Sequence, residues 1–135
     1  MKRFFGHAPL IRAGRLIELC GGHFRDLLLL LRETLLRAKA LPVDDATVDR
    51  AIVRVRSNFL PISIADAQWL AEIERERATL LKTTDAAEIQ RLTRFLDTHV
   101  VLYLKNGDEW YDVHPLVRNE VKLIVERANA AAGNA

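Results

Sequence analysis

The sequence predicts a mainly α-helical protein with one β-hairpin near its carboxyl end. Apolar residues recur at three- and four-residue steps through six segments, the period of a helix packed on one side. Two β-prone runs, 100–104 and 110–113, flank Asn106-Gly107, a dipeptide typical of a tight hairpin turn. Helices followed by a hairpin and a closing helix are the element order of a winged-helix module.

The first two predicted helices meet at a pair of glycines. The first runs from about Leu10 to Cys20 and ends at Gly21-Gly22, because glycine is the usual residue after a helix. The second spans 23–40 and is apolar over much of its circumference, so it needs neighbours on more than one side. Its main apolar stripe consists of Phe24, Leu27, Leu28, Leu31, Leu35 and Ala38, widened by Leu29, Leu30 and Leu36.

A third helix is predicted after the break at Leu41-Pro42-Val43, with Asp44 or Asp45 as its cap. Its inward residues are Val48, Ala51, Ile52, Val55 and Phe59. Leu60-Pro61 ends this helix and is the best internal boundary, since proline cannot continue a helix. The expected organisation is therefore a helical subdomain at 1–60, a second domain at 61–128 and a flexible small-residue tail at 129–135.

The second domain is predicted to contain two helices before the hairpin and one after it. These span 64–78, then 86–98 with caps from Thr83-Thr84-Asp85, and a final helix from Leu116. His114-Pro115 ends the second strand, and we expect a ring nitrogen of His114 to bond the backbone freed there rather than to act in catalysis.

Charge is distributed unevenly between the two predicted domains. Residues 1–60 carry 11 Lys/Arg against 6 Asp/Glu, a net charge of +5, whereas residues 61–135 carry 9 against 12, a net charge of −3. The single cysteine excludes an intrachain disulfide and suits a reducing compartment. No apolar run is long enough to span a bilayer, and residues 1–8 do not open a signal peptide. We expect a cytoplasmic protein without membrane contact.

Two segments carry a family resemblance. Residues 16–27, which include Gly21-Gly22 and Arg25, resemble the sensor-two region at the start of the helical lid of AAA+ ATPases. Residues 106–117 look like the winged-helix end of bacterial AAA-type ATPases that share the layout of origin-recognition initiators. The resemblance implies a lid-type helical bundle followed by a winged helix. It also implies a nucleotide-sensing role for Arg25, placed by the two glycines, as an arginine fork suits phosphate oxygens.

The chain lacks a phosphate-binding P-loop and the acidic strand end that holds magnesium, so we expect no ATP hydrolysis by this chain alone. The implied partner is a P-loop ATPase core domain, which would supply ATP and magnesium. A protein partner, a homo-oligomer or DNA are further expected contacts. The chain shows no nucleophile paired with a base, so a small enzyme has no supporting residues.

Nucleic-acid binding is the functional interpretation of the winged helix, and a stand-alone DNA-binding regulator is the alternative function. The possible contact residues are Arg50, Arg54, Arg56, Gln90, Arg91, Arg94 and Lys105. Acidic residues beside the turn, Asp108, Glu109 and Asp112, oppose phosphate contact, which favours a protein partner for this module.

A metal site is not favoured. Cys20 and His23, with His7, His99 or His114, provide no second ligand pair of the kind structural zinc requires. Cys20 is expected to be a small buried apolar residue.

Overall fold

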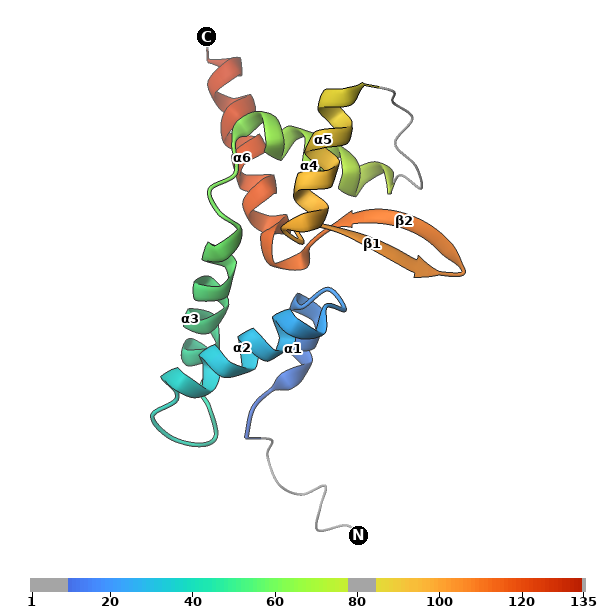
Figure 1. The fold of residues 1–135 in the computed structure, drawn as a ribbon. Coiled ribbons are helices and arrows are strands. Elements are labelled where there is room, and N and C mark those ends of the chain that lie inside the picture. Colours follow the sequence, from blue (N-terminus) through green and yellow to red (C-terminus); the bar gives the residue numbers. More distant parts are fainter. Residues whose placement is uncertain (1–9, 78–84, 135) are drawn as a thin grey trace. The chain divides into compact units, whose positions relative to one another are not determined.

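The computed structural model describes residues 10–77 and 85–134 and confirms a mainly helical chain with one antiparallel hairpin. The chain divides into two compact units, residues 1–58 and 59–135, close to the boundary expected at residue 60 (Figure 1). The predicted opening segment at 1–8, with His7, and the expected caps Thr83 and Thr84 lie outside the described residues.

The first unit contains α1 (Ala13–Leu19), α2 (Phe24–Arg37) and α3 (Asp45–Arg56), and the turn η2 (Ser57–Phe59) follows α3. Helix α2 packs against both α1 and α3. Asp44 is the cap of α3, because its carboxylate accepts a hydrogen bond of 2.7 Å from the backbone N–H of Thr47. Helix α1 begins three residues later than predicted. The expected inward residues Val48, Ala51, Ile52 and Val55 of α3 are buried.

The buried side of α2 does not coincide with the main apolar stripe of its sequence. Phe24, Leu28 and Leu35 of the expected stripe are 69%, 50% and 53% exposed, while Leu30 and Thr34 are fully buried. Because leucines occupy most of the circumference, the apolar period does not single out one face. Thr34 tolerates burial since its hydroxyl donates a hydrogen bond of 2.7 Å to the carbonyl of Leu30.

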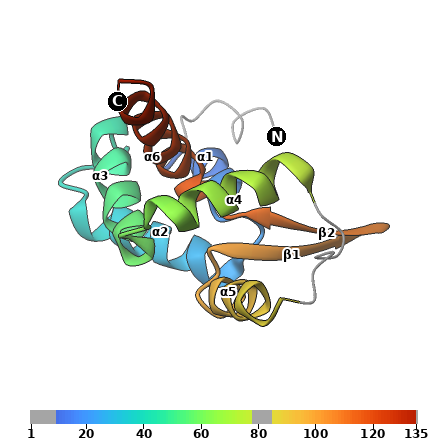
Figure 2. The ribbon, with the colours of Figure 1, turned by 90° about the horizontal axis from the view of Figure 1, so that it is seen from above.

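The second unit contains α4 (Ile64–Glu76), α5 (Ala86–Asp97), β1 (Val101–Asn106), β2 (Asp108–Val113) and α6 (Pro115–Gly133). Figure 2 shows the hairpin running between α4 and α5, with β2 beside α4 and β1 beside α5. The core between these elements is formed by Ala67, Trp69, Leu70, Ile73, Phe95, Val100, Val101, Val113, Val117 and Val121.

The hairpin turns on a single glycine. Asn106 pairs with Asp108, so Gly107 alone stands at the tip, with a φ of 82° that favours glycine. Val101 lies opposite Val113 in this register, and both side chains enter the core. Both strands therefore extend closer to the turn than the sequence predicted.

His114 has the structural role expected of it. It is fully buried at the start of α6, its Nδ1 accepts a hydrogen bond of 3.1 Å from the backbone N–H of Leu116, and its ring lies 5.0 Å from that of Phe59. Helix α6 continues to Gly133 and so includes most of the segment 129–135 that was predicted as a flexible tail. Its three consecutive alanines have the highest helix propensity of any residue.

Candidate functional site

The glycine pair between α1 and α2 adopts the conformation that only glycine enters readily. Gly21 and Gly22 have φ angles of 62° and 80°. A Cβ at Gly22 would meet no atom within 4 Å, so this glycine serves the backbone turn rather than a close approach of another element. The turn ends at His23, and α2 begins at once with Phe24 and Arg25.

Arg25 lies on the first turn of α2 and is exposed. No hydrogen bond or ion pair joins it to any residue in the described parts of the chain. The neighbouring carboxylate, Asp26, is buried and lies 3.3 Å from Nδ1 of His23 instead. The guanidinium of Arg25 is thus available to an anion from outside the chain. Arg25 lies shortly after the turn formed by Gly21 and Gly22.

The arginines of α3 form a second basic surface. Arg50 and Arg54 are exposed and stand one turn apart, and their guanidinium groups reach only the hydroxyls of Thr47 and Ser57, at 3.2 and 3.4 Å. Arg56 is only partly exposed. Two carboxylates of α3 lie near other cations, since Asp45 pairs with Arg12, the residue before α1, at 3.8 Å and Asp49 pairs with Arg15 of α1 at 2.5 Å. The carboxylate of Asp44 attracts Arg50, whereas no carboxylate pairs with Arg54 among the described residues.

The arginines of α5 are in a different position, because one carboxylate holds both. Asp66 of α4 lies 3.2 Å from Arg91 and 2.9 Å from Arg94. Arg91 also lies over the ring of Trp69, at 5.8 Å, and Arg94 over that of Phe95, at 4.7 Å. Both cations thus help to attach α5 to α4, which reduces their availability to a phosphate backbone.

The remaining basic residues near the hairpin are also compensated. Lys105 lies 3.0 Å from Glu109 across the strands. Asp112 is buried at the base of β2 and holds Arg118 of α6 at 2.9 Å, while Arg118 also donates to the carbonyl of Val113. The hairpin thus presents little net positive charge.

Glu109 and Tyr103 share a further interaction on the hairpin surface. The hydroxyl of Tyr103 donates a hydrogen bond to the carboxylate of Glu109, which raises the pKa of Tyr103 to about 12 and lowers the pKa of Glu109. A hydrogen bond from Lys105 lowers the pKa of Glu109 further. These groups interact with one another across the two strands, which is consistent with the observed register.

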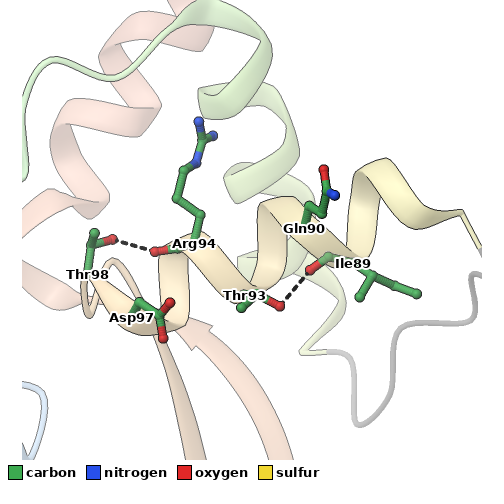
Figure 3. Close-up of a pocket in the computed structure, with 6 residues that line it drawn as sticks. All are labelled: Ile89, Gln90, Thr93, Arg94, Asp97 and Thr98. Carbon is green, nitrogen blue, oxygen red and sulfur yellow. Dashed lines mark hydrogen bonds between the residues drawn. The ribbon is translucent and has the colours of Figure 1, made fainter.

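Gln90 is one of the residues that line a pocket along α5 (Figure 3). Its lining consists of Ile89, Gln90, Thr93, Arg94, Asp97 and Thr98. All of them come from one helix and its cap, and both threonine hydroxyls donate to carbonyls of that helix, at 2.9 and 3.0 Å. The pocket offers no pair of groups for acid–base or nucleophilic chemistry.

The thiol of Cys20 is buried and donates to the carbonyl of Ile17, at 3.0 Å. Residues 10–77 and 85–134 contain no group of three metal-ligating side chains, and none of the helices within them is apolar over the length needed to cross a membrane. Comparison with protein-family models, curated proteins and solved structures finds no match to this chain.

Sequence reasoning missed two residues that define these surfaces. Asp66, which holds the α5 arginines, lies 28 residues from Arg94 in the chain, so no local pattern indicates the pairing. Arg32 of α2 is the second, because the sequence does not reveal which of the leucines around it are exposed.

Proposed function

We propose that this chain is a non-catalytic module of an AAA-type ATPase, with a lid-type first unit and a winged-helix second unit. Arg25 senses nucleotide bound to a separate P-loop core domain, which supplies ATP and magnesium. One observation carries the proposal: an exposed arginine without a carboxylate partner follows two left-handed glycines at the start of a helix. A permanently charged planar fork in that position suits phosphate oxygens.

The other charges of α2 support this assignment. Its two carboxylates, Asp26 and Glu33, lie beside His23 and Arg37 respectively, so neither neutralises Arg25. The second unit contributes protein contact rather than DNA contact, because Asp66 and Glu109 already hold the cations of α5 and the hairpin.

The test compares ATP turnover of the assembled ATPase carrying Arg25→Ala or Arg25→Lys with that carrying Arg127→Ala. Arg127 is an exposed arginine of α6 without an assigned role. Loss of one charged hydrogen bond to phosphate costs about 1.5–3 kcal/mol, so we expect turnover to fall roughly ten- to a hundredfold with Arg25→Ala and to be unchanged with Arg127→Ala. Equal turnover with Arg25→Ala and with Arg127→Ala would refute the sensor role. Tight binding of labelled ATP by this chain alone would also contradict the proposal.

A DNA-binding regulator is the second candidate function, and the exposed arginines of α3 favour it. Arg50 and Arg54 donate hydrogen bonds to hydroxyls rather than to carboxylates, so both remain available for phosphate contact. Fluorescence anisotropy on random duplex DNA at low and moderate salt tests this function. Salt-sensitive binding that Arg50→Ala and Arg54→Ala weaken supports it, and absence of binding at low salt excludes it.

A further inference from the structure

Helix α2 presents an apolar surface to solvent with an arginine at its centre. Residues three and four positions apart are neighbours on a helix surface, and the four such neighbours of Arg32 are all leucines: Leu28, Leu29, Leu35 and Leu36. Leu28, Leu35 and Leu36 are 50%, 53% and 67% exposed, and Phe24 extends the surface by one turn at 69%. So much exposed apolar area on one helix is typical of an interaction surface.

Arg32 has no carboxylate within this surface. It is exposed, and no hydrogen bond or ion pair joins it to another residue in the described parts. The two carboxylates of α2 lie elsewhere on the helix, Asp26 buried near His23 and Glu33 paired with Arg37. The charge on the exposed side of α2 is therefore exclusively positive.

We propose that this Arg32-centred leucine surface binds an amphipathic helix of a partner protein that carries a carboxylate in the middle of its own apolar face. Arginine is enriched at the centres of protein interfaces, where surrounding apolar contacts exclude water and strengthen the central ion pair. The complementary surface must therefore be apolar at its edge and negative at its centre. This inference is separate from nucleotide sensing, since it rests on Arg32 and its leucines and not on phosphate.

Charge decides between a partner helix and a second copy of this chain. A twofold contact through this surface would bring Arg25 and Arg32 of one copy against the same cations of the other, and like charges oppose such a contact. A carboxylate-centred helix meets no such repulsion. Two arginines are also too few for strong attraction to an anionic membrane, which takes a cluster of basic residues.

The test uses two synthetic helical peptides as probes. Each carries leucines three and four positions before and after a central residue, which is glutamate in one peptide and lysine in the other. We expect the wild-type chain to bind the glutamate peptide about tenfold more tightly, measured by anisotropy of a labelled peptide. Arg32→Glu should reverse this preference, and Leu28→Asn should weaken binding of the glutamate peptide.

Arg127→Glu is the matched control, because it reverses an exposed helical arginine on α6, outside this leucine surface and in the other unit. Circular dichroism establishes that each variant is folded. Equal affinity for both peptides, or an unchanged preference in Arg32→Glu, would overturn the proposal. So would self-association of the wild-type chain in sedimentation that Leu28→Asn abolishes, or binding to anionic vesicles through the same leucines.

Discussion

Replacing Asp66 by asparagine removes the charge that holds Arg91 and Arg94 while keeping the side-chain shape. The Arg94 pair is largely exposed, at 58% for the arginine, and such a pair contributes about 0.2–1 kcal/mol. The Arg91 pair is less exposed, at 33%, and belongs to the upper part of that range. Asp66 also stabilises the first turn of α4 through the helix dipole, by about 0.3–1 kcal/mol. We expect Asp66→Asn to lower the unfolding free energy of the second unit by about 1–2 kcal/mol at low salt.

Urea unfolding followed by tryptophan fluorescence measures this change, because both tryptophans, Trp69 and Trp110, belong to the second unit. Asp97→Asn is the control, since Asp97 is exposed at the last turn of α5, where a negative charge is unfavourable. We expect this control to be neutral or slightly stabilising. The cost of Asp66→Asn should shrink in about 1 M salt, where the screening length is short. A cost no larger than that of the control, or one insensitive to salt, would refute the assignment of Asp66.

Three further predictions concern the core, the glycine turn and the hairpin. Leu70→Ala should cost about 2–5 kcal/mol in the same urea experiment, because Leu70 is fully buried, and a cost near zero would contradict its place in the core. Gly22→Ala should lower the free energy of unfolding by about 1–2 kcal/mol, because alanine is strained at the φ of 80° that Gly22 adopts. Gly14→Ala within α1 should raise it by about 0.5–1 kcal/mol, because alanine favours the helix. Calorimetry measures whether each variant is less or more stable than the wild-type chain. Glu109→Gln should bring the pKa of Tyr103 from about 12 toward its ordinary value of 10.0 in a spectrophotometric titration. Because the folded-state pKa of Tyr103 is raised, the stabilisation from this hydrogen bond should persist below pH 10 and disappear as the pH rises through about 12 in the wild-type chain only.

The local elements followed from the sequence because their causes are local. Asp44 caps α3 through the N–H of Thr47, and Asp85 caps α5 through that of Ala87, each contact lying within three residues. Asn106-Gly107 indicated the hairpin, although the turn proved to centre on Gly107 alone. The buried residues of α3 were predicted because its charged residues leave only one apolar face.

The apolar stripe of α2 did not identify its buried side, for the opposite reason. Its leucines surround most of the helix, so burial of any side satisfies the pattern equally well. Only packing against α1 and α3 placed Leu30 inside and left Leu28 and Leu35 exposed. This packing leaves leucines around Arg32 exposed and so creates the candidate interaction surface.

The sequence by itself determined the helices, the hairpin, the glycine turn and the presence of Arg25 on the first turn of α2. These features depend on propensities and hydrogen bonds between residues close in the chain. Only the tertiary structure decided which cations remain available. Arg91 and Arg94 are held by a carboxylate from another helix, whereas Arg25 and Arg32 have no such partner among the described residues. Ion pairing depends on distance in space, and a sequence does not state which distant carboxylate will lie within reach of an arginine.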